Sequence, residues 1–300
     1  MKFFLTPFQF IRNKTRPWRR SRHEIKNRLK HLEKLAELNA EISALKVKTD
    51  ILNQPRYRDD KRLLKYGFKA YSQTDEDGII QEIFQRIGVT NKTFIEIGVG
   101  NGLENNTLFL LLKGWKGVWI DGDSKNVKAI QNKFSFLQYN GRLSIKQAWI
   151  DKDNIDSLIN DFGLPQEIDL LSIDIDGNDY HVFKNIVSLN PRVVVIEYNA
   201  KLPPPVKWVM TYNQCHTKTN TDYFGASLKS FEHLFQKKGY LLVGCNIAGV
   251  NAFFVRKDLM EKHFHSDCSA ENHYEDLKLW LLAGFGQGSG ADFGPYEDNL

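Results

Sequence analysis

Apolar residues recur every three or four positions between about residues 22 and 48, a stretch without Gly or Pro. This spacing is helical and predicts one long helix near the N-terminus. The steps break a strict heptad, and the segment is short for a coiled coil. We expect a helix whose apolar stripe binds a second copy of the chain or folds onto the body of the protein. The stripe contains Ile25, Leu29, Leu32, Leu35, Leu38, Ile42 and Leu45.

A second pattern begins near residue 68, where short apolar runs alternate with segments of helical periodicity. Near-continuous apolar runs are typical of parallel strands that are buried on both faces. The pattern predicts strands near 93–97, 117–120, 145–150, 169–173 and 192–197, with helices near 74–88, 103–112, 125–134, 154–162 and 179–187.

The end of this region has a different topology. A helical segment at 227–239 precedes two apolar runs, 240–246 and 251–257. These runs lie too close together for a parallel crossover, so they must pair as an antiparallel hairpin. The sequence therefore predicts an α/β fold, a Rossmann-like, mostly parallel seven-stranded sheet with an antiparallel final strand, preceded by the N-terminal helix.

Composition divides the chain into three expected parts. Residues 1–66 comprise a basic arm, the long helix and a linker at 49–66, and residues 67–260 comprise the α/β domain. Residues 261–300 are expected to form a C-terminal helix and a flexible, glycine-rich tail. The three cysteines are far apart, so neither a disulfide framework nor a zinc cluster is indicated.

Charge is concentrated at the N-terminus. Residues 1–50 hold 13 Lys and Arg against 5 Asp and Glu, a net charge of +8, whereas the rest of the chain holds 28 against 31, or −3. A nearly neutral body argues against nucleic acid as a partner. The arm mixes cations with residues such as Phe3, Phe8 and Trp18, which suits either an anionic membrane surface or a disordered basic arm. With no apolar run of roughly 20 residues and no export signal, we expect a cytoplasmic protein that could be peripheral at the inner membrane face.

The most informative turn is "FIEIGVGNG", where a predicted strand ends at Ile97 and glycines follow. Glycines permit a tight turn and let a ligand approach the backbone, and such ligands bind beyond the carboxyl ends of parallel strands. Asp121 ends the next strand about 20 residues on, where a carboxylate can bind both hydroxyls of a ribose. The spacing G-x-G-x-G departs from the dinucleotide fingerprint, although the acid would serve either nucleotide.

Four blocks together carry a resemblance to a known family: "FIEIGVGNGLENNTLFLLLKGWKGVWIDGD", "LLSIDIDGNDYHVF", "RVVVIEYN" and "YFGASLKSFEHLFQKKGYLLVGCNIAGVNAFFVRKDL". The chain resembles the FkbM-like methyltransferases over roughly residues 72–259. The resemblance implies a class I methyltransferase fold, S-adenosyl-L-methionine as cofactor and methyl transfer to a hydroxyl, often on a sugar. It also implies that Glu96, Gly98 and Gly100 wrap the methionine part of the cofactor and that Asp121 binds the ribose. Ala148 and Trp149 would hold the adenine.

Acidic residues gather in "SIDIDGNDYHVF", where Asp174 and Asp176 follow a strand, and "IEYN" ends the next strand with Glu197 and Asn199. Oxygen ligands of this kind suit Mg²⁺ or another divalent cation. The arrangement is similar to metal-dependent O-methyltransferases, which implies a metal on Asp174, Glu197 and Asn199. The ion held by Asp174 would then orient the acceptor hydroxyl, and His181 or a neighbour would take its proton. The alternative is that the two aspartates hold the loop and cap the following helix.

The long segment 199–226 is expected to cover the acceptor, because long loops in compact domains are usually functional. Trp208 and Tyr212 could stack on a sugar, and His216 could read its hydroxyls. The predicted function is therefore an O-methyltransferase acting on a saccharide or glycoconjugate. The alternatives are an NAD-dependent oxidoreductase, which the glycine spacing disfavours, and a non-catalytic scaffold that acts through its N-terminal helix.

Overall fold

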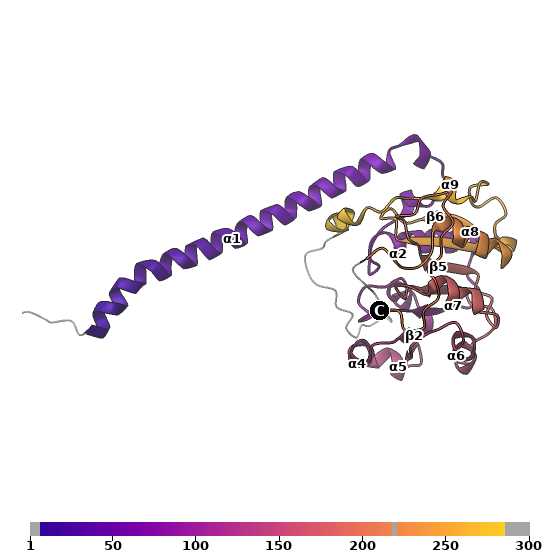
Figure 1. Ribbon diagram of the computed structural model, residues 1–300, viewed down its shortest axis with the longest axis horizontal. Coiled ribbons are helices and arrows are strands. Elements are labelled where there is room, and N and C mark those ends of the chain that lie inside the picture. The colour runs from indigo at the N-terminus through magenta and orange to yellow at the C-terminus, as the bar shows by residue number, and fades with distance from the viewer. Residues whose placement is uncertain (1–6, 218–220, 286–300) are drawn as a thin grey trace, which may run out of the picture.

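The computed structural model describes residues 7–217 and 221–285 and the side chains of 22–217 and 221–282. A body containing a β-sheet carries one long helix that projects away from it (Figure 1). The seven strands of the sheet are arranged in the order β3-β2-β1-β4-β5-β7-β6. They are β1 Thr93–Ile97, β2 Lys116–Asp121, β3 Leu143–Gln147, β4 Leu170–Ile173, β5 Val193–Glu197, β6 Tyr240–Cys245 and β7 Asn251–Arg256.

Strand pairing confirms the predicted topology. β1 pairs in parallel with β2 and with β4, so the strand order reverses on either side of β1. β7 pairs antiparallel with both β5 and β6, which makes the final strand the antiparallel one. Every residue of β1 is buried, as expected for a central strand covered on both faces.

Helices cover both faces of the sheet. The helices of the body are α2 Glu76–Ile87, α3 Leu108–Leu112, α4 Ser124–Lys133, α5 Ser135–Tyr139, α6 Ile155–Asp161, α7 Asp179–Asn185, α8 Leu228–Lys237 and α9 Ala270–His273. The helix predicted at 103–112 begins only at Leu108, so that prediction was too long. Residues 99–107 instead form the turn that follows β1, in which the Asn105 N–H donates to the Tyr71 carbonyl and the Asn106 N–H donates to Glu96 rather than within a helix.

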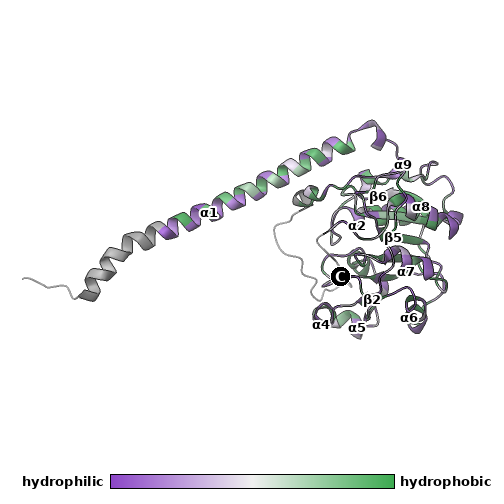
Figure 2. Ribbon diagram, in the orientation of Figure 1, coloured by the Kyte–Doolittle hydropathy of each residue, from purple (hydrophilic) through white to green (hydrophobic). Residues whose placement is uncertain are grey.

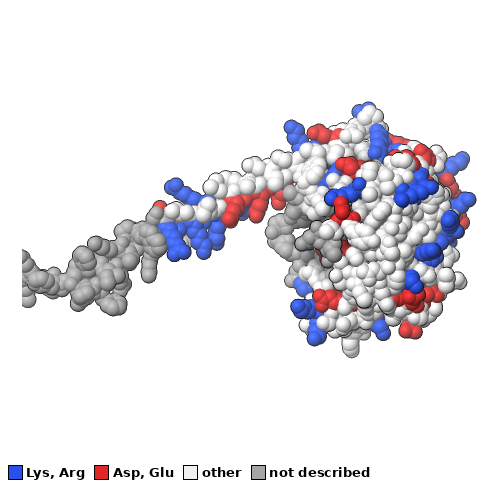
Figure 3. All heavy atoms as spheres, viewed as in Figure 1, with Lys and Arg blue, Asp and Glu red and all other residues white. Residues whose placement is uncertain are grey.

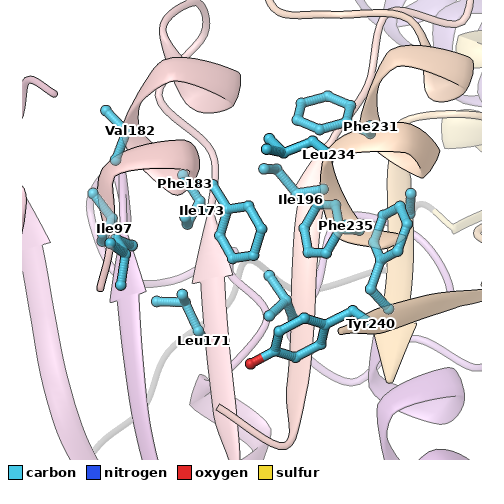
Figure 4. Close-up of a cluster of buried hydrophobic side chains, with 14 of the residues drawn as sticks. Ile97, Leu171, Ile173, Val182, Phe183, Ile196, Phe231, Leu234, Phe235 and Tyr240 are labelled. Carbon is cyan, nitrogen blue, oxygen red and sulfur yellow. The ribbon is translucent and has the colours of Figure 1, made fainter. Parts of the chain in front are cut away.

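Two apolar clusters fill the spaces between the sheet and its helices. Side chains of α2, α3, α4 and α5 pack on one face of the sheet, and side chains of α6, α7 and α8 pack on the other. Figure 4 shows part of the second cluster, with Phe183 of α7 beside Phe235 of α8. Phe183 and Phe254 of β7 both stack on Phe235, at 4.0 and 3.7 Å between ring centroids. This packing joins α7 and α8 to β7 on one face of the sheet.

The N-terminal helix α1 spans Pro7–Leu52 and its last turns rest on the body. Ala44 is buried and Ile51 packs against the first apolar cluster, whereas the stripe residues from Ile25 to Leu45 remain exposed. Figure 2 shows hydrophobic positions recurring along α1. Part of the arm assigned to membrane contact, including Phe3, lies outside the described residues, as do the side chains of its remaining members.

Residues 49–66 are not a free linker. Leu52 ends α1, and the 3₁₀ turns η1 Pro55–Tyr57 and η2 Leu64–Tyr66 follow. Tyr57, Leu63 and Leu64 are buried in the first apolar cluster. The charged residues of this segment suggested a solvated connection, but its apolar residues contribute to the core.

The C-terminal segment also packs on the body. Phe264 and Leu281 are buried in the first apolar cluster, and the 3₁₀ segment η4 Leu279–Phe285 lies against α1. The tail predicted beyond residue 285 lies outside the described residues. In the described part of the chain, no helix is long and apolar enough to cross a membrane.

Candidate active site

A cavity of about 550 Å³ opens at the carboxyl ends of the parallel strands. The turns after β1, β2, β3 and β4 and the last residue of β5 contribute to its lining, together with residues of the segment 199–226. This is the edge at which α/β sheets bind ligands, next to the point where strand order reverses. Gly98, Gly100, Asp121, Ala148 and Trp149, predicted for the cofactor, all line the cavity.

The glycine turn is required by backbone geometry. Gly98 has φ +83°, and a Cβ atom added there would lie 1.6 Å from the carbonyl oxygen of Asp174. Gly102 has φ +78°, and a Cβ atom there would meet Trp119, Ile130 and Phe134 at about 3 Å. The first glycine therefore lets the turn after β1 touch the turn after β4, and the third lets the loop pack on the core.

Asp121 links the glycine turn to the end of β2. Its Oδ2 accepts the Gly100 N–H at 2.8 Å, and its Oδ1 accepts the N–H of Asp123 at 2.8 Å and the side chain of Asn126 at 3.2 Å. A carboxylate offers about four acceptor positions, so capacity for a ligand hydroxyl remains. These bonds orient the Asp121 carboxylate before any ligand arrives.

Ala148 and Trp149 follow β3 at the far side of Asp121. Ala148 N–H donates to the Asp121 carbonyl, which holds the end of β3 beside the end of β2. The Trp149 side chain is half exposed, and its Nε1 donates to the Gln214 carbonyl at 2.9 Å. Trp149 therefore joins this side of the cavity to the segment 199–226, while its ring borders the space in which an adenine would lie.

Glu96 does not line the cavity. It is buried, and its carboxylate accepts the N–H of Asn106 and the hydroxyl of Thr107. Burial raises the pKa of Glu96 to about 7. The role implied by the resemblance, direct contact with the methionine part of the cofactor, therefore needs revision: Glu96 shapes the loop between β1 and α3.

The acidic turn after β4 is held together by Asp179. Its Oδ1 accepts the Ile175 N–H and its Oδ2 accepts the Gly177 N–H, both at 2.9 Å. Burial raises the pKa of this carboxyl to about 6. The turn also places Asp176 at φ 55°, the left-handed region that aspartate tolerates better than most residues. Asp179 thus holds the loop at the start of α7.

Three carboxylates converge at the cavity. One oxygen from each of Asp174, Asp176 and Glu197 lies within 4.8 Å of the others, and all three residues line the cavity. Asn199, predicted as the third metal ligand, is directed elsewhere because its amide donates to the carbonyls of Asp222 and Phe224 and its oxygen accepts the Lys201 N–H. The structure therefore groups Asp176 with Asp174 and Glu197 in place of Asn199.

His181 and His216 have different surroundings. His181 lies on α7, and its Nε2 is 2.8 Å from the carbonyl oxygen of Met210, away from the cavity lining. His216 lines the cavity and packs over Gly177, and its Nε2 is buried with no hydrogen-bond partner among the described residues. The geometry does not support His181 as the proton acceptor and makes His216 the better placed imidazole.

The other two acceptor candidates belong to the loop itself. Trp208 packs edge-to-face on Tyr223, with ring centroids 5.6 Å apart. Tyr212 lies edge-to-face with the His181 ring at 5.5 Å. Neither lines the cavity, so both stabilise the segment 199–226 rather than offer a stacking surface there.

Sequence reasoning missed a buried polar cluster that supports the cavity from the other side. Asp75 and Glu76 are fully buried; Asp75 accepts the Ile247 N–H, and Glu76 accepts the side chains of Asn246 and Asn251. Gln73, two residues earlier, lines the cavity. The run "SQTDED" was interpreted only as the acidic first turn of a helix, because nothing local indicates that its partners lie about 170 residues away.

The sheet order, the antiparallel final strand and the glycine turn joined to an acid at the end of β2 define an S-adenosylmethionine-dependent methyltransferase of the Rossmann-like class. Residues 68–239 match the family model described as the methyltransferase FkbM domain, which is more than half of the chain. The chain belongs to the FkbM methyltransferase family. That membership leaves the oxidoreductase and scaffold alternatives without support.

Three solved structures that are similar to the chain share 11–16% of its sequence. They include an O-methyltransferase from Bacillus cereus in complex with SAH (14% identity, 72% of this chain and 89% of that chain, TM-score 0.39). Another is the N-terminal domain of EvdMO1 with SAH bound (11% identity, 60% of this chain and 79% of that chain, TM-score 0.40). A third is residues 961–1257 of the StiE O-methyltransferase (16% identity, 55% of this chain and 52% of that chain, TM-score 0.34). The chain therefore spans about half the length of that structure. No curated protein matched the chain in the corresponding sequence comparison.

Proposed function

We propose that this protein transfers the methyl group of S-adenosylmethionine to a hydroxyl of a saccharide or glycoconjugate. The observation that carries the proposal is that the glycine turn with Asp121 and the three converging carboxylates line one cavity. One end suits a nucleoside and the other suits a polar, hydroxyl-bearing acceptor. A methyl donor and a hydroxyl could therefore meet between them.

The chain's own residues fit the cofactor. Gly100 has open space where a Cβ would lie, Asp121 has acceptor capacity for a ribose hydroxyl, and Trp149 offers a ring face beside it. When bound, S-adenosylmethionine supplies a methyl group activated by its sulfonium. Because this donor is already activated, the contribution expected from the protein is mainly to hold the acceptor oxygen in line with the methyl carbon.

The acceptor end can accept a proton and orient a hydroxyl. The oxygen forms a bond to the methyl carbon as the carbon–sulfur bond breaks, the electron pair stays on sulfur, and the hydroxyl proton must leave. Asp174, Asp176 and Glu197 are acceptors for that hydrogen bond, and His216 offers a buried imidazole nitrogen at the same cavity. A polar lining of this kind favours an acceptor with several hydroxyls over an apolar one.

The same carboxylates fit a divalent cation. Three carboxylate oxygens within 4.8 Å form an all-oxygen donor set, which is the chemistry that Mg²⁺, Ca²⁺ or Mn²⁺ prefers. A metal bound there would lower the pKa of a coordinated acceptor hydroxyl. The residues that would hold it are Asp174, Asp176 and Glu197, whereas the Asn199 amide is bonded within the loop.

Calorimetric titration with S-adenosylhomocysteine is the decisive first experiment. We expect micromolar binding by the wild type and none with NAD. Asp121→Ala should weaken binding roughly 10- to 100-fold, because hydrogen bonds to a charged group contribute about 1.5–3 kcal/mol. Absence of binding by the wild type would refute the proposal, whereas binding would justify screening saccharides with and without EDTA.

The localisation proposed with this function is cytoplasmic, at the inner face of a membrane. Its support is the basic, aromatic composition of residues 1–20. Flotation with anionic vesicles, compared between the full chain and a chain lacking residues 1–20, tests it. Equal flotation of the two chains would show that residues 1–20 do not mediate membrane contact.

A further inference from the structure

Six of the seven residues of the exposed stripe of α1 are spaced symmetrically, and Leu45 lies beyond them. From Ile25 to Ile42, the steps between successive apolar residues are 4, 3, 3, 3 and 4, which read the same from either end. The point of symmetry lies between Glu33 and Lys34. All six side chains are 43 to 59% exposed: Ile25, Leu29, Leu32, Leu35, Leu38 and Ile42.

Within residues 7–217 and 221–285, no part of the body covers this stripe. Ala44, Lys48 and Ile51 face the body and η4, and they lie on a different side of the helix from Leu38 and Ile42. Figure 1 shows that α1 runs away from the body before it reaches most of the stripe. An apolar face about 26 Å long, at 1.5 Å per residue, is thus left for a partner.

We propose that a second copy of this chain packs on the stripe as an antiparallel helix, with the twofold axis between Glu33 and Lys34. Ile25 then lies level with Ile42 of the second copy, Leu29 with Leu38, and Leu32 with Leu35. Twofold contacts of this type require a surface that complements itself when reversed, which is what the palindromic spacing provides. The average step of 3.4 residues is shorter than 3.6 and favours left-handed crossing of the two helices.

Charge favours the antiparallel arrangement over the parallel one. Residues 22–34 hold five Lys and Arg against two Glu, whereas residues 35–45 hold two Glu and no Lys or Arg. Figure 3 shows the basic section of α1 followed by an acidic section. In the antiparallel pair, the basic half of each helix lies beside the acidic half of the other. Packed helices are about 8–10 Å apart, within the Debye length of about 10 Å at 0.1 M salt.

The same symmetry matches individual charged and polar residues. Lys26, Lys30 and Lys34 lie level with Glu41, Glu37 and Glu33 of the second copy. On the stripe itself, Arg28 lies level with Asn39, so a guanidinium donor meets an amide acceptor. A polar pair inside an apolar seam fixes register, as single polar residues do in coiled coils.

Cysteine cross-linking of the full-length chain tests the orientation. In a background of Cys215→Ser and Cys268→Ser, an Ile25→Cys chain mixed with an Ile42→Cys chain should form a disulfide between the two. Each variant alone should form little, because the two copies of residue 25 are about 26 Å apart along the axis. Efficient cross-linking of the Ile25→Cys chain to itself would establish a parallel pair and overturn the proposal.

Light scattering tests the interface. The wild type should have twice the mass of one chain at micromolar concentration. Leu32→Glu or Leu35→Lys alone should give a monomer, and a mixture of the two should restore the dimer, because Leu32 of one chain faces Leu35 of the other. Lys46→Gln, which changes the net charge as Leu32→Glu does but lies outside the paired residues 25–42, should remain dimeric. A monomeric wild type, or a dimer that survives Leu32→Glu, would overturn the proposal.

Discussion

Gly98 and Asp174 come from different strands, yet their backbones touch. A methyl group on Gly98 would overlap the Asp174 carbonyl at 1.6 Å. The turn that suits the cofactor and the turn that carries the acids are therefore in direct contact. Geometry at one is transmitted to the other without any intervening side chain.

Substitution of this glycine should disturb the whole cavity. We expect Gly98→Ala to abolish binding of S-adenosylhomocysteine and to lower the free energy of unfolding by more than the roughly 1–2 kcal/mol of left-handed strain alone. Gly141→Ala is the matched control, since Gly141 has φ +71° with open space around its Cβ position. Calorimetry and urea unfolding measure both effects. Equal behaviour of the two variants would show that contact with Asp174 is unimportant.

Glu96 should make stability depend on pH. Burial raises its pKa from 4.5 to about 7, so the native state binds this proton more tightly than the unfolded chain. The stabilisation is complete below the unfolded pKa and is lost as pH rises to about 7. Urea unfolding from pH ~5 to ~8 should therefore show a decline that is smaller in Glu96→Gln. Buried ion pairs such as Asp169 with Arg192 act in the opposite direction but are common to both proteins. Parallel pH profiles would contradict the assignment.

The segment 199–226 is fastened to the turn after β4 and to α7. The Asn178 side chain donates to the Asn213 carbonyl at 2.7 Å, and His181 contacts the Met210 carbonyl. The Gly225 N–H donates to the Gly177 carbonyl at 3.0 Å. The loop is thereby held over the carboxylates that would bind the acceptor.

Kinetics can distinguish a histidine that holds the loop, His181, from one that accepts a proton, His216. We expect His181→Ala to raise the KM for the acceptor several-fold while leaving the pH profile of kcat unchanged, since its contact is with the loop backbone. His216→Ala should lower kcat and alter that profile, because its ring lines the cavity. The reverse pattern would return His181 to the role that the sequence suggested.

How far the sequence could predict the molecule follows from the range of the interactions. The strands and the hairpin were predictable because periodicity and spacing are local, and Gly98, Gly100 and Asp121 were predictable because parallel strand ends share one edge. The direction of the Asn199 amide and the burial of Glu96 were not, because each depends on hydrogen bonds made after the chain has folded. The same holds for Asp75, whose partner Ile247 is distant in sequence.

The N-terminal 66 residues do not form a detachable module. Leu63 is buried against the β-sheet side, next to Gly244 of β6, and contributes to the main apolar cluster. Leu63→Ala should lower the free energy of unfolding by about 2–5 kcal/mol. Val89→Ala, at a site 42% exposed, should change it by less than about 1 kcal/mol. Chemical denaturation measures both, and a negligible effect at Leu63 would restore the linker interpretation.

The two ends of the segment 199–226 are hydrogen-bonded to each other, which has a consequence for protein engineering. Asn199 N–H donates to the Ala226 carbonyl at 2.9 Å, so the loop leaves and rejoins the body at adjacent points. An insert from a relative could be exchanged between these two residues without moving β5 or α8. The junction of Gly98 with Asp174 allows no such freedom. New acceptors are therefore best sought by grafting the corresponding loop of a relative while the glycine turn and Asp121 stay unchanged. Asn178 should be kept, because its side chain donates to the loop backbone.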